Sequence, residues 1–257
     1  MTGMSAEALP AVVAWPLLIA VAGLLGSFLN VCISRLPLRE SIVFPGSHCP
    51  RCQAPIRYYD NVPVLSFALL GGRCRACRGP ISWRYPVVEI LTVAVSVLVV
   101  ATLGPTWEAW RAILLGLALI AVTFTDFEHL LIPDRITLPG IVVGLVTQLY
   151  PAPRALLGAI VGTLLAGALF YGIAVASQGG MGGGDVKLAA MIGAFLGWQR
   201  VLVAIFLAVV AGGIVAVGLL LARRKGRKDP LPFGPFLALG GLLSALWGST
   251  LLSWYLG

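Results

Sequence analysis

Charged residues make up 11% of this 257-residue chain, whereas hydrophobic residues make up 59% and the mean hydropathy is +0.96. A soluble domain holds about a quarter charged residues, so this composition excludes an ordinary soluble protein, and with it a collagen, a coiled coil or a disordered tail. Lys and Arg outnumber Asp and Glu by 18 to 10. We expect an all-α polytopic membrane protein.

Apolar stretches recur at about the 20-residue length that crosses a hydrocarbon core. Eight candidate spans follow in chain order: 11–33, 87–104, 108–125, 131–150, 155–176, 186–198, 201–222 and 233–255. The sixth is short and the fourth contains Arg135 and Pro139, so six or seven true crossings are alternatives. The first stretch lacks the flanks of a cleaved signal peptide and is expected to be retained. We therefore expect a first transmembrane segment (1–33), a soluble insert (34–86) and a transmembrane domain (87–257).

Positive charge predicts the orientation of the spans. Thirteen of the 18 cations lie in two segments, the insert and the run 223–228 between the last two spans. With eight spans both segments fall on one side, which the positive-inside rule makes cytoplasmic. Contact with lipid headgroups is the favoured role of these cations. Binding of nucleic acid is not expected, because no stacking aromatics are interleaved in the run 223–228.

The insert contains two CxxC pairs separated by 21 residues, formed by Cys49, Cys52, Cys74 and Cys77. Four thiolates at this spacing can close a tetrahedral Zn²⁺ site and leave no open position for catalysis, so a structural zinc site is expected. Two disulfides or a redox dithiol are the alternatives. A reducing cytoplasmic face argues against disulfides. His48 could replace one cysteine as a ligand, but we expect it to be a neighbour of the site. Cys32, inside the first span, is expected to be a small packing residue.

The ten acidic residues can be judged one by one. Glu7, Glu108 and Asp229 lie in flanks or loops and need no function, and Glu40 and Asp60 belong to the insert. The others lie at or near span ends, where a carboxylate is costly and a function is the default hypothesis; they are Glu89, Asp126, Glu128, Asp134 and Asp185.

Asp126 and Asp185 fall at the same cytoplasmic boundary, although 59 positions separate them. Two adjacent carboxyls share a proton, so one can act as a base on water and the other as an acid. Helix ends predict that Asp185 is the ionised base, because it begins a span, and that Asp126, which ends one, is the acid. The glycines at 179, 180 and 182–184 before Asp185 allow close approach of backbone and are not expected to hold a helix.

Several short motifs occur together in a fixed order. They are GSFLNV at 26–31, RLP at 35–37, the paired CxxC insert with NVP at 61–63 and Ser66, RYP at 84–86 with Glu89, Asp126 with IPD at 132–134, GGGDVKL at 182–188 and PFGP at 232–235. Together they resemble the bacterial type IV prepilin peptidases over nearly the whole chain. Each motif alone is weak, but their joint occurrence is specific.

The resemblance implies a bifunctional enzyme of the bacterial inner membrane. It implies an aspartic peptidase of the GxGD kind that removes the basic leader of prepilins and pseudopilins after a glycine, on the cytoplasmic side. It also implies methylation of the new amino terminus with S-adenosylmethionine. The implied catalytic residues are Asp126 and Asp185, with Asp134 a weaker third candidate. Possible supporting residues are Glu89, Gly182, Gly184 and Lys187.

Two other classes of function are alternatives. A proton-coupled transporter would also place acids in an apolar bundle, but it needs a polar path to the outer side, whereas these acids gather at one face. A non-catalytic assembly factor would use the zinc module for docking, and replacement of Asp126 or Asp185 by Asn would then leave function intact.

Overall fold

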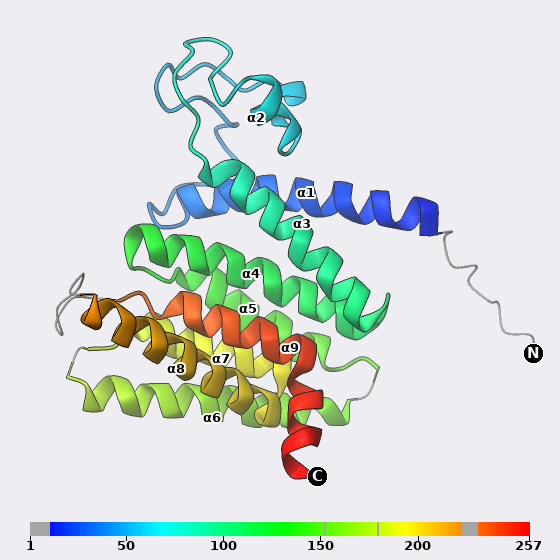
Figure 1. The fold of residues 1–257 in the computed structure, drawn as a ribbon, viewed down its shortest axis with the longest axis vertical. Helices are drawn as coiled ribbons and strands as arrows, with labels where there is room; N and C mark the ends of the chain where they lie inside the picture. Colours follow the sequence, from blue (N-terminus) through cyan, green and yellow to red (C-terminus); the bar gives the residue numbers. More distant parts are fainter. Residues whose placement is uncertain (1–10, 152, 179, 223–230) are drawn as a thin grey trace, which may run out of the picture. The chain divides into compact units, whose positions relative to one another are not determined.

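The computed structural model describes residues 11–151, 153–178, 180–222 and 231–257. In these residues the structure is helical, apart from two isolated β-bridges and loops. The α-helices in chain order are α1 (Ala11–Arg35), α2 (Leu65–Leu69), α3 (Arg84–Leu103), α4 (Trp107–His129), α5 (Asp134–Thr147), α6 (Arg154–Ala176), α7 (Gly183–Leu196), α8 (Trp198–Leu221) and α9 (Gly234–Leu256) (Figure 1). All eight predicted spans are helices, and the all-α class is confirmed.

Six of these eight helices are long and apolar enough to cross a membrane alone; they are α1, α3, α4, α6, α8 and α9. The other two, α5 and α7, have 14 residues each. Such a helix is about 21 Å long, which is shorter than a hydrocarbon core of roughly 30 Å. Helix length therefore supports six crossings and does not establish the predicted eight.

The described chain divides into two compact units. The first consists of residues up to Asn30 together with 46–98, so it joins the insert to most of α1 and α3. Within it, a Cβ at Gly26 would lie 2.8 Å from the Cα of Glu89, so glycine allows the two helix backbones to approach closely. The Asn30 side chain donates to the carbonyl of Tyr85 at 3.1 Å. These contacts bring the GSFLN and RYP segments side by side.

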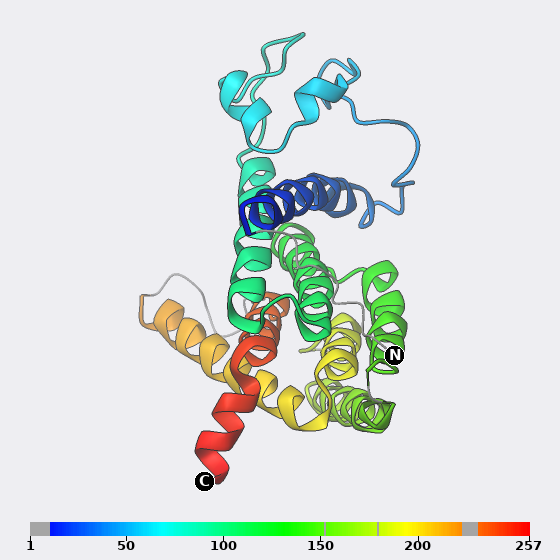
Figure 2. The same ribbon diagram turned by 90° about the vertical axis from the view of Figure 1, so that its right-hand side faces the viewer.

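The second unit contains residues 31–45 and 99–257, and its core is α7. Every residue of α7 from Leu188 to Leu196 is buried, and the helix packs mainly against α6 and α5 (Figures 1 and 2). Small residues make this packing close: a Cβ at Gly193 would lie 2.3 Å from the carbonyl oxygen of Gly162 on α6. Close backbone contact through small residues is the usual way in which helices associate in lipid.

The short helices α5 and α7 run between the same two regions of α4. At the beginning of α4, the indole of Trp107 donates to the carbonyl of Thr147, the last residue of α5, at 2.9 Å. Near the other end, Asp126 shares a cavity with Ile132, just before α5, and Asp185, in the first turn of α7. Both short helices are therefore antiparallel to α4 and carry the chain across this unit.

Candidate active site

Asp126 and Asp185 line the same cavity, of about 260 Å³, in the second unit. Asp126 lies in the last turn of α4 and is 6% exposed, and Asp185 is half-buried in the first turn of α7. The rest of the lining comes from the turn after α4 and from the glycines before Asp185; it consists of Leu130, Leu131, Ile132, Gly182 and Gly184. The structure thus brings together the two predicted aspartates and both predicted supporting glycines.

Local backbone geometry shapes this cavity. Leu130 adopts a left-handed conformation (φ 50°) and its N–H bonds to the carbonyl of Asp126, which ends α4 and turns the chain toward α5. A Cβ at Gly184 would lie 2.8 Å from the Cβ of Ile132, so glycine lets the beginning of α7 approach this turn. The expectation that the glycine run holds no helix is wrong at Gly183 and Gly184, which form the first turn of α7. Glycine disfavours a helix because its backbone loses more conformational entropy, and the close approach of Gly184 to Ile132 is what requires glycine here. Gly179 lies outside the described residues.

Asp126 has a main-chain partner that sequence reasoning missed. The N–H of Gly234, the first residue of α9, donates to Oδ2 of Asp126 at 2.9 Å. A Cβ at Gly234 would lie 2.7 Å from the same oxygen, so only glycine fits this approach without displacement. The positive end of the α9 dipole therefore faces Asp126. The PFGP motif at 232–235 marks this segment in the sequence. The contact with Asp126 could not be predicted from it, because the two are far apart along the chain.

Asp134 is placed beside this region and not among the residues that line the cavity. Both of its carboxylate oxygens accept hydrogen bonds from Nζ of Lys187, each at 2.7 Å. Asp134 begins α5 and Lys187 lies in the first turn of α7, so the pair joins the two helix starts. The carboxylate of Asp134 is therefore paired with the ammonium group of Lys187. This arrangement suits a supporting role better than that of a catalytic acid.

Glu89 belongs to the first unit, in which its side chain bonds to the backbone of the insert. Its Oε2 accepts a hydrogen bond from the N–H of Val64 at 2.7 Å, and the residue is only 7% exposed. Val64 directly precedes α2 and has a φ of 61°, which is uncommon for a β-branched residue. Glu89 therefore fixes the backbone at the start of α2.

The four insert cysteines converge. Their Sγ atoms all lie within 4.8 Å of one another, so the cluster could hold one metal ion. His48 is not a member of this group; its ring contacts the carbonyl of Gly46 at 3.0 Å. The predicted neighbour role of His48 agrees with this arrangement, and Cys32 is buried at 7% exposure, as expected for a packing residue.

The two CxxC pairs have the same backbone conformation. The N–H of Cys49 donates to the carbonyl of Ala54, and that of Cys74 donates to the carbonyl of Gly79. The fourth residue after each of these cysteines, Gln53 or Arg78, has a φ of 58°. Backbone N–H groups of Cys52 and then Arg51 lower the pKa of Cys49 to about 6. The backbone around Cys49 therefore favours a thiolate at this cysteine, which is the form that binds metal.

Comparison with protein families covers both units. The Bacterial Peptidase A24 N-terminal domain model matches residues 20–103, and the Type IV leader peptidase family model matches residues 113–217. The chain belongs to the type IV leader peptidase family. The resemblance inferred from the motifs is confirmed.

Curated relatives in this family match along most of their length. A protein of Aeromonas salmonicida (strain A449) is 39% identical over 263 residues, which covers 91% of this chain and 90% of the relative. One from Aeromonas hydrophila is 39% identical, and one from Pseudomonas aeruginosa is 37% identical, with the same coverage. All three are named prepilin leader peptidase/N-methyltransferase. No solved structure matches the chain.

Proposed function

We propose that the protein is a membrane-embedded aspartic endopeptidase that removes the basic leader of type IV prepilins and pseudopilins after a glycine. It then methylates the new amino-terminal residue. The observation that carries the proposal is the shared cavity of Asp126 and Asp185 in a chain of this family. Family membership also favours this function over a transporter or a non-catalytic assembly factor.

Asp126 is the general base in this proposal. Two carboxyls at one cavity share a proton, because both cannot ionise cheaply at close range. The N–H of Gly234 stabilises negative charge on Asp126, so the shared proton rests on Asp185. Asp126 then takes a proton from the attacking water, and Asp185 donates one to the scissile carbonyl oxygen or the leaving amine. This assignment reverses the one predicted from the helix ends alone.

The cysteine cluster is proposed to hold one structural Zn²⁺. Four thiolates match the preference of zinc for a tetrahedral sulfur site with no open position. The ion would hold together the insert, which has little regular structure. Methylation requires a methyl donor, for which we propose S-adenosylmethionine.

The proposed location is the bacterial inner membrane, with Asp126 and Asp185 at the cytoplasmic face. Asp126 lies in the last turn of α4 and Asp185 in the first turn of α7, so both lie at one end of the second unit. The cation-rich segments 34–86 and 223–228 are assigned to the same side by the positive-inside rule. The latter segment lies outside the described residues. Lipid headgroups are the proposed partners of these cations, and nucleic acid is not.

Mass spectrometry of the product tests the proposal. Purified protein is incubated with a full-length prepilin, with and without S-adenosylmethionine. We expect loss of the leader in both reactions and addition of one methyl group only when the donor is present. An unchanged prepilin mass would contradict the peptidase, and a cleaved but unmethylated product in the presence of the donor would contradict the methyltransferase.

A further inference from the structure

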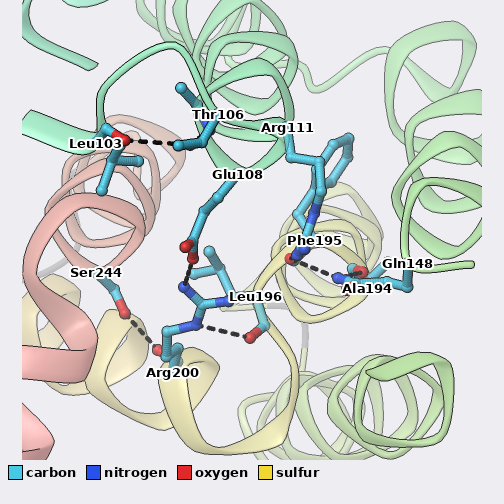
Figure 3. Close-up of polar contacts among 11 residues, drawn as sticks. Leu103, Thr106, Glu108, Arg111, Gln148, Ala194, Phe195, Leu196, Arg200 and Ser244 are labelled. Carbon is cyan, nitrogen blue, oxygen red and sulfur yellow. Dashed lines mark hydrogen bonds and ion pairs between the residues drawn. The ribbon is translucent and has the colours of Figure 1, made fainter. Parts of the chain in front are cut away.

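A cluster of polar side chains surrounds the carboxyl end of α7, the end away from Asp185 (Figure 3). Nε2 of Gln148 donates to the carbonyls of Phe195 at 2.8 Å and Ala194 at 3.2 Å. Nη2 of Arg111 donates to the carbonyl of Phe195 at 2.5 Å, and Nε of Arg200 to that of Leu196 at 3.1 Å. We call Arg111, Gln148 and Arg200 the α7 cap.

The α7 cap completes the hydrogen bonding of a helix that ends inside the bundle. The last four carbonyls of any α-helix lack intrahelical partners, and leaving them unpaired in an apolar environment is costly. In α7 the first of these four, at Gly193, accepts from the N–H of Gly197 at 2.9 Å. The α7 cap satisfies the other three. Its two guanidinium groups also place positive charge at the negative end of the helix dipole.

The α7 cap is itself held in place by neighbouring helices. Nη1 of Arg200 pairs with Oε1 of Glu108 at 2.5 Å, and the hydroxyl of Ser244 on α9 donates to the carbonyl of Arg200 at 2.6 Å. Gln148 is only 3% exposed. Glu108, assigned no function from the sequence, thus belongs to a network that links α4, α8 and α9 (Figure 3).

Arg111 connects the two helices that carry the aspartates. It lies 15 residues before Asp126 on α4, and Phe195 lies ten residues after Asp185 on α7. Direct packing between α4 and α7 is slight, because α7 packs mainly against α5 and α6. The hydrogen bond from Arg111 to Phe195 is a direct link between the two helices that opposes sliding of α7 along α4. A helix is stiff over such lengths of about 15 to 22 Å, so an axial shift at one end displaces the carboxyl at the other.

We propose that Arg111 and Gln148 are positioning residues that fix the axial position of α7, Arg111 relative to α4 and Gln148 relative to the end of α5, and so hold Asp185 within reach of Asp126. The inference rests on the proposed catalytic role of Asp185. It assigns to the polar cluster a role in the reaction beyond the pairing of buried carbonyls.

Steady-state cleavage of a prepilin by the purified full chain tests this proposal, with Arg111→Met, Arg111→Lys and Gln148→Leu as variants. A misplacement of about 1 Å can cost up to ~10²-fold in rate. We therefore expect Arg111→Met and Gln148→Leu to lower kcat about tenfold or more, with KM changed less than about twofold. Arg111→Lys should recover part of the loss, because an ammonium group still donates to the carbonyl of Phe195.

Trp107→Phe is the matched control. It removes a side-chain hydrogen bond to a helix-terminal carbonyl at the same end of α4, but the helix concerned is α5. Its kcat should remain within about twofold of the wild type. Wild-type kcat in folded Gln148→Leu and Arg111→Met would overturn the proposal. So would a parallel loss of kcat and thermal stability that Trp107→Phe reproduces.

Two further measurements keep the outcomes distinct. If Arg111→Met does not yield folded protein, Arg111→Lys and Gln148→Leu decide by the same criteria, with thermal unfolding as the check on folding. Asp185→Asn is assayed alongside. Retained cleavage by Asp185→Asn would refute the proposed function, whereas an inactive Asp185→Asn beside fully active cap variants would refute only the positioning role.

Discussion

At the level of single residues, Asp126 accepts a main-chain hydrogen bond from a distant part of the chain. The N–H of Gly234 arrives from a helix that begins 108 positions later in the chain. Helix ends within α4 and α7 alone would place the charge on Asp185. A directly donated hydrogen bond outweighs a helix-end effect of about 0.3 to 1 kcal/mol, because bonds to charged groups contribute about 1.5 to 3 kcal/mol.

Infrared difference spectroscopy can locate the shared proton. We expect a protonated-carboxyl band in the wild-type protein at neutral pH, and its loss in Asp185→Asn, because Asp185 holds the proton. In Asp126→Asn the band should persist. Loss of the band in Asp126→Asn alone would return the base role to Asp185.

Gly234→Ala tests the contact itself. The added Cβ would lie 2.7 Å from Oδ2 of Asp126, so the helix start or the carboxylate must move. We expect the rate of prepilin cleavage to fall at least about tenfold, since misplacement of catalytic groups by about 1 Å can cost ~10²-fold. Gly213→Ala on α8, where a Cβ meets nothing within 4 Å, is the control and should keep wild-type activity. Equal activity of the two variants would show that this contact does not matter to the reaction.

Asp134→Asn separates the supporting carboxylate from the proposed dyad. Asp134 pairs with Lys187, and both side chains are more than one-third exposed, at 54% and 39%. Exposed ion pairs contribute about 0.2 to 1 kcal/mol. The variant should therefore lose less than about fivefold in kcat/KM for prepilin cleavage. A loss of several hundredfold would make Asp134 a member of the catalytic set.

At the level of elements, the fold of the insert depends on the turns formed by its two CxxC pairs. Its regular structure amounts to a 3₁₀ helix (Tyr58–Asn61), the five-residue α2 and two isolated bridges. A segment of this size has too little apolar core to fold alone, so metal binding would supply much of its folding free energy. The bidentate pair of Arg75 with Asp60, at 2.6 and 2.8 Å, adds a local link that also lowers the pKa of Asp60.

Metal content as a function of pH tests the proposed zinc site. Backbone N–H groups lower the pKa of Cys49 to about 6, so its thiolate persists at neutral pH and is lost as pH falls through that value. We expect one Zn²⁺ per chain at pH 7 and its release at acidic pH, together with proteolytic sensitivity of the insert. Cys74→Ser should show both effects at pH 7. Active protein that contains no metal would contradict the site.

At the level of the whole molecule, hydropathy predicted every described α-helix except the five-residue α2. The reason is that burial in lipid requires long apolar segments. It could not decide the number of crossings, since α5 and α7 are short helices enclosed by neighbours. Counting the spans along the chain predicted that Asp126 and Asp185 lie at the same boundary, because each lies near a helix end. The partners of α7 escaped prediction: Arg111, Gln148 and Arg200 form no motif, and only the three-dimensional packing brings them to the carbonyls of Ala194, Phe195 and Leu196.

Cleavage by Asp126→Asn and Asp185→Asn is the most direct test of the central claim, that these two aspartates form one catalytic pair. General acid and base groups contribute about 10² to 10⁴-fold each. We expect both variants to cleave a prepilin at least about 10²-fold more slowly than the wild type, while they still methylate a pilin whose leader has already been removed. Cleavage by either variant within about tenfold of the wild-type rate would contradict the account.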